Sequence, residues 1–348
     1  MNGKAKYHHL IPRTYLQSWC FSNDSLHAYS KSDLTKKKQL NINNHFGIQN
    51  YHTIKVGMPI CTDEDLKKIF QSLNGYKVEY EGKLLQSLKE YNQYFYDFDE
   101  WKIYYAKTES IVPKKKKNTI KSEINQCRIV DIEEAWSRQY ENGWNSLKQI
   151  IEQKLLTTNA LEIDAFNKEE LMKFIVSLDW RSEKGNEELE KILEFINKLL
   201  PLKEIDLSKD DRSIAFETNA YEWSKRNYLL KEFNEFLQGK GIINDQVNSY
   251  IRDCTLEFFI ANGNVGFLTS DNPSFIYHFN DGLSHVMPLT PKILVRVLKG
   301  STDKYFIKLL NDELVQWFNG IIIENSNELA LSNKPSIQYG VEVLQKSK

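Results

Sequence analysis

The sequence predicts an α+β fold in which short N-terminal strands precede a helical middle region, and a C-terminal antiparallel sheet is covered by a helix. Three observations support this prediction. Residues 1–60 contain short extended runs separated by turns, residues 62–240 repeat apolar side chains at helical spacing, and residues 250–348 alternate short apolar runs with turn signals. We therefore expect a single α+β domain over residues 1–348.

The N-terminal segment is expected to form a hairpin. Residues 27–30 are typical of a strand, the polar stretch 31–38 predicts a turn, and residues 39–42 can return as the partner strand. Residues 46–56 are a further short extended candidate. The segment thus contributes strands and loops rather than helices.

The middle region predicts a series of helices. Thr62 is expected to cap the first one, because its hydroxyl and the acidic residues after it suit the unpaired N–H groups at a helix start. Further helices are expected at residues 78–96, 129–155, 166–178, 187–200 and 220–237. Trp136, Tyr140 and Trp144 recur at helical spacing, which indicates a stripe that faces a core. Residues 104–124 are the most polar and lysine-rich stretch and are expected to form an exposed insertion.

The C-terminal third predicts strands and one helix. Residues 262–264, Asn-Gly-Asn, are a strong turn signal between two apolar runs. Strands are expected at residues 254–260, 266–269, 274–277, 286–288 and 293–298, and the closing helix at residues 303–324. Two lone histidines, His278 and His285, flank a predicted turn at residues 280–282 and are expected at the surface.

Composition and charge limit the classes of function. The 348 residues carry a formal net charge of −1, with 41% hydrophobic and 27% charged residues, which is ordinary for a globular protein. A basic field over the whole surface is excluded, so binding to a nucleic acid needs a local patch. The dense basic run from Lys114 to Lys117 fits a solvated loop better than a phosphate contact.

The cysteines and the apolar runs bear on the cellular compartment. Cys20, Cys61, Cys127 and Cys254 are isolated from one another, so no zinc ribbon or thioredoxin-like pair is expected. Free cysteines and an N-terminus without an apolar targeting segment predict a cytoplasmic protein. No apolar run reaches the roughly 18 residues of a membrane span, so we expect no membrane association.

The first candidate functional element is the N-terminal run that contains His8, His9 and Arg13. Adjacent histidines in a strand point to opposite faces, so one of them can face a site. Histidine transfers protons near neutral pH, and arginine can hold a phosphate or a carboxylate with two hydrogen bonds. A structural histidine beside a surface arginine explains the same residues equally well.

The second candidate element is Thr269-Ser270-Asp271-Asn272-Pro273, which follows a predicted strand. Asp271 at a strand end can bind a metal, act as a base or hold an arginine. The competing structural interpretation is that these short polar side chains bond to nearby backbone N–H groups, as they do in ordinary turns.

A third candidate is Arg181, which ends a predicted helix and can reach an anion or interact with the helix terminus. The sequence signatures of P-loop ATPases, Rossmann oxidoreductases, α/β-hydrolases and zincins are absent from the chain. A metal-dependent nuclease of the ββα-metal type is a weaker alternative. It needs a hairpin before its histidine and an Asn and a His on a later helix, whereas only seven residues precede His8 and no helix is expected at residues 43–45.

In order along the chain, these elements resemble a bacterial family known as domain of unknown function family 4238. Residues 8–19 are similar to its His-His/Tyr-x-x-Pro-Arg-x-Tyr-Leu-x-x-Phe pattern, with Trp in place of the last Phe. The Thr-Ser-Asp-Asn-Pro element at residues 269–273 is intact. Arg181 resembles the family's mid-chain arginine, although Ser182-Glu183 follows it where the family usually has Thr-Pro. The resemblance covers nearly the whole chain.

The resemblance implies a bacterial protein with a role in defence against phage, and it implies no particular reaction. Our leading hypothesis is an antiphage effector that acts on a nucleic acid or nucleotide through one polar site, because histidine, arginine and aspartate together suit phosphate chemistry. The expected catalytic residues are His8, His9, Arg13 and Asp271, and the expected substrate-binding residues are Tyr15, Arg181, Ser270 and Asn272. A hydrolase or nuclease-like reaction with a divalent metal fits this hypothesis.

The alternative hypothesis is a non-enzymatic sensor that binds a phage component, such as a phage protein. The same residues would then form a buried polar network that ties the N-terminal segment to the sheet. Exposure separates the two hypotheses, since a catalytic cluster lines an open pocket and a structural network is closed and fully paired.

Overall fold

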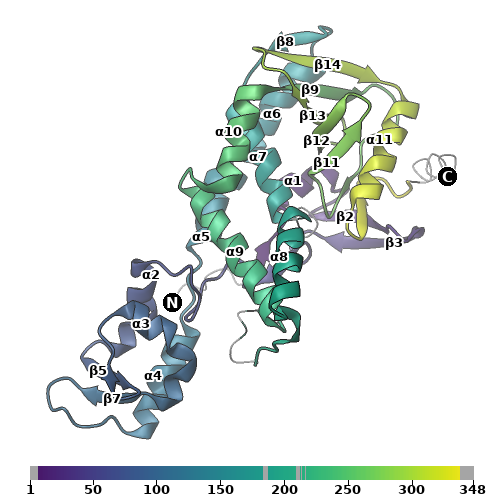
Figure 1. Ribbon diagram of the computed structural model, residues 1–348. Helices are drawn as coiled ribbons and strands as arrows, with labels where there is room; N and C mark the ends of the chain where they lie inside the picture. Colours follow the sequence, from purple (N-terminus) through teal and green to yellow (C-terminus); the bar gives the residue numbers. More distant parts are fainter. Residues whose placement is uncertain (1–6, 183–186, 209–211, 213, 216, 338–348) are drawn as a thin grey trace. The chain divides into compact units, whose positions relative to one another are not determined.

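The computed structural model describes residues 7–182, 187–208, 212, 214, 215 and 217–337, and these form two compact units (Figure 1). Within the described chain, the first unit contains residues 49–134 and 192–234, and the second contains residues 7–48, 135–191 and 235–337. Helices and strands are both abundant, which confirms the predicted α+β class. Glu183, which follows the Arg181 element, lies outside the described residues.

The second unit is built on a six-stranded sheet with the strand order β11-β12-β13-β9-β14-β8. Its strands are β8 (Glu162–Asp164), β9 (Cys254–Ala261), β11 (Phe275–Phe279), β12 (Gly282–Thr290), β13 (Ile293–Lys299) and β14 (Lys304–Leu310). Neighbouring strands are antiparallel, except that β14 runs parallel to β9. The expected C-terminal antiparallel sheet is therefore present, with one parallel pair added to it.

Helices pack on this sheet, and α11 (Asp312–Asn325) covers one face of it (Figure 1). Phe318 of α11 lies 4.8 Å from Phe259 of β9, measured between ring centres, within a buried apolar cluster. The side chain of Asn311 caps α11, because its Oδ1 accepts the N–H of Leu314 at 3.0 Å. The predicted closing helix is thus confirmed, but it begins after β14. Tyr305 and Ile307 alternate with less buried neighbours along β14, which is the spacing of a strand.

The second unit also contains a four-stranded antiparallel sheet with the order β10-β15-β2-β3. Its strands are β2 (Ser25–Ser30), β3 (Asp33–Asn41), β10 (Thr269–Ser270) and β15 (Leu329–Ser332). β2 and β3 confirm the predicted hairpin, although β3 begins within the stretch that was expected to turn. β3 is an edge strand with exposed lysines, an arrangement that also discourages pairing with other chains. A separate pair joins β1 (Tyr7–His9) to β4 (Gly47–Gln49).

The remaining helices include one with an unusual turn. They are α1 (Arg13–Leu16), η1 (Gln17–Trp19), α5 (Asp131–Trp136), η4 (Ser137–Glu141), α6 (Asn142–Leu156), α7 (Lys168–Arg181), α8 (Glu187–Leu199), α9 (Ala220–Leu237) and α10 (Gly241–Asp253). The expected helix 129–155 is present as α5 and α6, but the π-helix η4 separates them. Trp136 and Trp144 are buried, as predicted for the aromatic stripe. α10 is not predicted from the sequence, because Gly239 and Gly241 indicate a helix end there.

The first unit contains most of α8 and α9, several shorter helices and a three-stranded sheet with the order β6-β5-β7. Its elements are α2 (Asp63–Ile69), η2 (Gln71–Leu73), β5 (Tyr76–Tyr80), β6 (Lys83–Leu84), α3 (Leu88–Gln93), η3 (Phe95–Glu100), β7 (Lys102–Tyr105), α4 (Lys114–Gln126) and η5 (Leu202–Glu204). Thr62 caps α2 as predicted, in a reciprocal arrangement with Asp65.

Two expectations for this unit differ from the structure. The helix expected at residues 78–96 is replaced by β5, β6 and the short α3, because Glu81 and Gly82 adopt positive φ angles and turn the chain between the strands. The lysine-rich segment 104–124 contains α4, whose Ile120 and Ile124 are fully buried one turn apart. In the described part of the chain, no helix combines the length and the apolar character that crossing a membrane requires.

Candidate functional site

The N-terminal element places its two histidines on opposite faces of β1, as its sequence predicts. His8 is completely buried, whereas His9 is half-buried and its Nε2–H donates to the Ile42 carbonyl at 3.2 Å. Arg13 is exposed at the start of α1, and its guanidinium donates to Oδ1 of Asn43 at 2.7 Å. Among these three residues, Arg13 is the exposed one, although its guanidinium already has a partner in Asn43.

Tyr15 connects the N-terminal element to the later Thr-Ser-Asp-Asn-Pro element. Its side chain is completely buried, and its hydroxyl lies 2.7 Å from Oγ1 of Thr269 and donates to the Pro288 carbonyl at 2.7 Å. Burial raises the pKa of the Tyr15 phenol, so the hydroxyl stays protonated. Trp19 makes a similar connection, since its indole N–H donates to the Phe267 carbonyl at 3.0 Å. The two sequence elements therefore meet through buried side chains.

Arg181 also joins the N-terminal element, from the end of α7. Its guanidinium donates to Oε1 of Glu141 at 2.8 Å and to the carbonyl of His9, and it lies 4.8 Å from the ring centre of Trp136. Only 2% of the residue is exposed, so its charge is removed from water and balanced by Glu141. An anionic ligand would have to displace this carboxylate to reach Arg181.

Asp271 is held by the backbone of a neighbouring loop. Its two carboxylate oxygens accept the N–H groups of Asn327 at 2.8 Å, Glu328 at 2.7 Å and Leu329 at 2.9 Å. Burial raises the pKa of Asp271, and these three N–H groups partly offset that rise. Because both oxygens are engaged, Asp271 fixes residues 327–329 in place, and a metal ion or a substrate would compete with backbone N–H groups for it.

Ser270 and Asn272 complete the connections of this element. Oδ1 of Asn272 accepts the hydroxyl of Ser182 at 2.6 Å, and its Nδ2 donates to the Asn325 carbonyl at 2.8 Å. The hydroxyl of Ser270 donates to the Asn272 carbonyl at 2.8 Å. Asn272 thus ties the end of α7 to the end of α11.

The structure therefore brings most of the predicted site residues into one buried assembly. We call it the motif network, and its members are Tyr15, Arg181, Ser270, Asp271 and Asn272. Four of them are buried, and Asp271 is half-buried. The hydrogen bonds of the network tie β1, α1, α7 and α11 together, which is the arrangement that the structural hypothesis expects.

A second buried polar cluster surrounds His285, which the sequence wrongly predicts at the surface, whereas His278 is exposed as expected. The Nε2–H of His285 donates to the hydroxyl of Ser274 at 2.9 Å, and Nδ1 accepts the Tyr250 hydroxyl at 3.4 Å. Burial lowers the pKa of His285 to about 3. An Asp179 carboxylate oxygen lies 3.7 Å from Nε2, so the cluster has the residue types of a catalytic triad.

Its geometry differs from that of a working triad. Ser274 is completely buried, and its hydroxyl donates to the Ile175 carbonyl at 2.7 Å rather than to the histidine. The serine therefore cannot pass its proton to His285, as a triad nucleophile must. We assign this cluster a structural role between α7, α10 and the large sheet.

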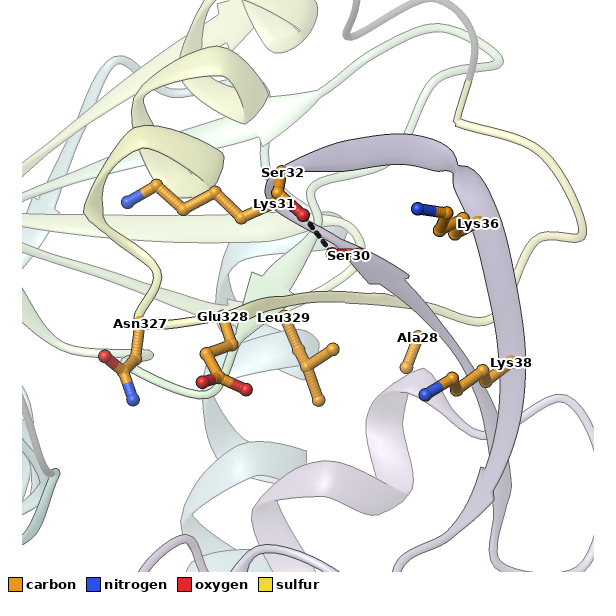
Figure 2. A pocket seen from close by; sticks show the side chains of 9 residues that line it. All are labelled: Ala28, Ser30, Lys31, Ser32, Lys36, Lys38, Asn327, Glu328 and Leu329. Carbon is orange, nitrogen blue, oxygen red and sulfur yellow. Dashed lines mark hydrogen bonds between the residues drawn. The ribbon is translucent and has the colours of Figure 1, made fainter.

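An open pocket of about 750 Å³ lies beside the β2–β3 hairpin (Figure 2). Its lining is rich in lysine and serine and consists of Ala28, Ser30, Lys31, Ser32, Lys36, Lys38, Asn327, Glu328 and Leu329. Figure 2 shows Lys36 and Lys38 extending from β3 on one side, with residues 327–329 on the other. The volume lies within the range of roughly 300–1,000 Å³ that is typical of ligand sites. We call this hollow the hairpin pocket.

The charges of the hairpin pocket favour an anion. Lys36 and Lys38 line the pocket opposite the carboxylate of Glu328. The third lysine, Lys31, directs its ammonium to backbone carbonyls instead. Within the part of the chain that the structure describes, the Lys36 ammonium pairs only with Asp33, at 3.3 Å and in a solvent-exposed geometry that stabilises little. Lys38 forms no ion pair within the described residues. The hydroxyls of Ser30 and Ser32, which lie 2.9 Å apart, add neutral hydrogen-bonding groups.

The motif network and the hairpin pocket share a wall. Asp271 holds the backbone of residues 327–329, and these residues line the pocket. Lys31 fixes the same region from the hairpin side, since its ammonium donates to the carbonyls of Glu324 at 2.7 Å and Ser326 at 2.8 Å. Asp271, which the sequence indicates as a catalytic residue, thus shapes a pocket that is lined by other residues.

The sequence analysis assigned Lys36 and Lys38 to a turn and gave them no role. In the structure they lie two positions apart on β3, and both line the hairpin pocket. Lys38 pairs with Ala28, whereas Lys36 lies where the register between β2 and β3 shifts. The run Lys36-Lys37-Lys38 next to a predicted strand was the signal available for this basic surface.

Comparisons with known proteins give one match. The model of a family described as a protein of unknown function (DUF4238) matches residues 7–336. No curated protein and no solved structure matches the chain. The matched region contains the motif network and the hairpin pocket.

Proposed function

The chain belongs to the DUF4238 family, and on that premise we propose that it is a binding protein of antiphage defence that recognises a phosphate-bearing ligand, a nucleotide or a nucleic acid, at the hairpin pocket. The defence role rests on the resemblance between its sequence elements and this family. The ligand class rests on the chemistry of the pocket.

One observation carries the proposal of a phosphate-bearing ligand. The ammonium groups of Lys36 and Lys38 extend from one strand toward the same hollow, where a single carboxylate opposes them (Figure 2). Lysine binds phosphate as a point charge, and serine hydroxyls next to it supply further donors. A local patch of this kind reconciles phosphate binding with the net charge of −1 for the whole chain.

The motif network supports a role in binding more than a role in catalysis. Asp271 and Arg181 already have charged or backbone partners, and Ser270, Asn272 and Tyr15 are buried. A nuclease-like reaction at His9, Arg13 and Asp271 would require the Asp271 carboxylate to leave three backbone N–H groups. The network instead fixes the loop that forms one wall of the hairpin pocket.

The test is binding of the purified full chain to a fluorescein-labelled single-stranded DNA and to a fluorescent ATP analogue, followed by anisotropy. We expect the Lys36→Ala/Lys38→Ala double variant to bind about a hundredfold more weakly, since each lost charged hydrogen bond costs roughly 1.5 kcal/mol or more. Binding to the wild type should weaken as salt is added, because lysine–phosphate contacts release counterions.

Lys37→Ala is the matched control. Lys37 lies between the two lysines on β3, does not line the pocket, and donates to the Pro335 carbonyl at 3.1 Å. The Lys37→Ala variant loses one charge from the same strand but no residue of the pocket, so its affinity for the two probes should stay within about threefold of the wild type. Equal affinity of the double variant and the wild type for both probes would refute the pocket assignment. A plaque assay with the same variants tests the defence role. That role is refuted if cells that express the wild-type protein are no better protected against phage than cells without it.

Cleavage of the labelled DNA with Mg²⁺ or Mn²⁺ present tests the enzymatic alternative in the same preparation. If the DNA is cut and Arg13→Ala or Asp271→Asn abolishes cutting in a folded protein, the catalytic hypothesis replaces the binding proposal. Arg13 is the informative position, because it is exposed and its loss leaves the motif network intact.

A further inference from the structure

A second cavity lies in the second unit, where the π-helix η4 and α6 face the start of α7. It has a volume of about 290 Å³. Tyr140, Gly143 and Trp144 line it from η4 and α6, and Asn167, Glu170 and Phe174 line it from the end of the preceding loop and α7. None of these residues belongs to the hairpin pocket or to the motif network.

The aromatic part of the cavity is rigid. Trp144 and Phe174 stack with ring centres 4.0 Å apart and ring planes 7° from parallel. Tyr140 stacks on Phe236, with ring centres 5.2 Å apart and ring planes 13° from parallel, and this contact holds the Tyr140 ring in place. Trp144 and Phe174 are 1% and 4% exposed and already stack on each other, so the half-buried Tyr140 is the ring that a flat ligand can reach. A ring that is already ordered loses little conformational freedom when such a ligand binds.

The backbone around the cavity departs from regular helix. Tyr140 lies in η4, a wide turn of a type that recurs at functional sites. Asn167 begins α7 with a φ of 45°, in the left-handed region that few residues other than glycine adopt readily. Two irregular backbone segments thus border one small cavity.

The polar groups of the cavity are of both hydrogen-bonding types. At the rim, Gln139 and Asn167 offer amides, Glu170 offers a carboxylate and Lys173 offers an ammonium group. Amides both donate and accept, so together these groups can bond to the edge of a heterocycle that carries both donors and acceptors.

We propose that this cavity binds a nucleobase, as a free base or within a nucleoside. Nucleobases are flat, stack on aromatic side chains and are recognised by hydrogen bonds to their edges. The volume of about 290 Å³ suits one base with part of its sugar and is small for a dinucleotide cofactor. The cavity lacks a lysine cluster of the kind in the hairpin pocket, so phosphate is not needed for binding. This inference does not depend on the proposed function.

Gly143 provides a way to close the cavity without disturbing the fold. A Cβ atom added at Gly143 meets no heavy atom within 4 Å, and the residue is helical. Gly143→Leu therefore places a bulky side chain at the cavity with little cost to folding, and Gly143→Ala is the matched control. Asn167→Gly removes one rim amide and suits the positive φ of that position.

The experiment titrates the full chain separately with adenosine, guanosine, cytidine and uridine, using tryptophan fluorescence and calorimetry. We expect at least one nucleoside to bind to the wild type and to Gly143→Ala with similar affinity. Gly143→Leu should bind at least about tenfold more weakly, and Asn167→Gly about threefold to tenfold more weakly, in line with the loss of a stacking site or of one hydrogen bond. Melting temperatures of all variants confirm that they are folded.

Two outcomes would overturn the inference: no nucleoside binds at millimolar concentration, or Gly143→Leu binds as tightly as the wild type. The Lys36→Ala/Lys38→Ala variant should retain nucleoside binding, since nucleosides carry no phosphate. Loss of nucleoside binding in that folded variant would place the ligand in the hairpin pocket and refute a second site. The nucleoside titrations can therefore be interpreted even if the hairpin pocket proves not to bind phosphate.

Discussion

The turn at residues 269–273 and the strand β3 are both rich in polar side chains, but they differ in whether those side chains have partners. In the turn, Ser270 and Asn272 are buried and bond to protein atoms, and both oxygens of Asp271 accept backbone N–H groups. On β3, the ammonium groups of Lys36 and Lys38 stand in solvent, with at most one exposed ion pair.

This difference separates residues that maintain the structure from residues that are available to a ligand. A polar group that is buried and fully paired gains nothing from a ligand unless it first loses its partner. An exposed ammonium group that lines a pocket gives up only bound water when it contacts a ligand. Substitutions in the motif network should therefore lower the stability of the fold, whereas substitutions in the hairpin pocket should lower the affinity for the ligand.

The largest expected effect is on Arg181. Arg181→Ala removes a buried ion pair with Glu141 and leaves that carboxylate without its partner, which should lower the free energy of unfolding by about 3–5 kcal/mol. Arg13→Ala is the control, because Arg13 is exposed and its change should stay within about 0.5 kcal/mol. Urea denaturation followed by circular dichroism measures both. A similar small change for the two arginines would contradict the assignment of Arg181 to a structural network.

The next effect concerns pH and His285. Its pKa is about 3 in the folded protein and about 6.5 when unfolded, so the unfolded chain binds more protons between these values. The stability contributed by neutral His285 is present above pH 6.5 and is lost as the pH falls toward 3. At pH 5 the loss should be about 2 kcal/mol relative to pH 7.5.

The variant His285→Gln, which keeps a hydrogen-bond donor for Ser274, should show a flatter dependence of stability on pH between 5 and 7. His278→Gln, an exposed histidine on the same hairpin, controls for the loss of one histidine. The measurement is the urea midpoint at several pH values. Parallel curves for wild type and His285→Gln would show that the burial of His285 does not govern this window.

The smallest effect links the two regions. Asp271→Asn replaces one acceptor oxygen by an amide that cannot accept an N–H from residues 327–329, and it should cost roughly 1 kcal/mol of stability. Because these residues line the hairpin pocket, we also expect phosphate-ligand affinity to fall about threefold, without direct contact between Asp271 and the ligand. Anisotropy with the labelled DNA measures this change. Unaltered affinity in a destabilised variant would show that the shared wall does not shape the pocket.

Regular elements with strong periodicity could be predicted from the sequence. The helix expected at residues 220–237 is α9, and Thr62 caps α2 as its sequence indicates. The errors fall where a local signal was overridden. The sequence predicts a helix over β5 and β6 because their few apolar residues also fit a helical spacing. It predicts one helix over β14 and α11 because both are apolar and Asn311 alone marks the boundary.

The candidate site was predicted less well than the fold, for a physical reason. The sequence shows which residues can do chemistry, but it does not show whether they already have partners. The contact between Tyr15 and Thr269 joins distant parts of the chain, as does the bond between Arg181 and His9. The hairpin pocket depends on which face of the sheet Lys38 occupies. That face is set by the strand register, in which Lys38 pairs with Ala28, and the sequence alone does not show the register.

The pairing of β2 with β15 has a consequence for how the protein is made. Ser30 lies opposite Leu329, so β2 leaves the ribosome long before its partner strand β15. Until then, β2 and β3 form an isolated hairpin, which is marginally stable at best in water. Folding of this sheet must await the synthesis of β15, since closing so long a loop precedes the gain from pairing. A polypeptide released before Leu329 would have no wall opposite Lys36 and Lys38, so incomplete chains should be unable to bind at that surface.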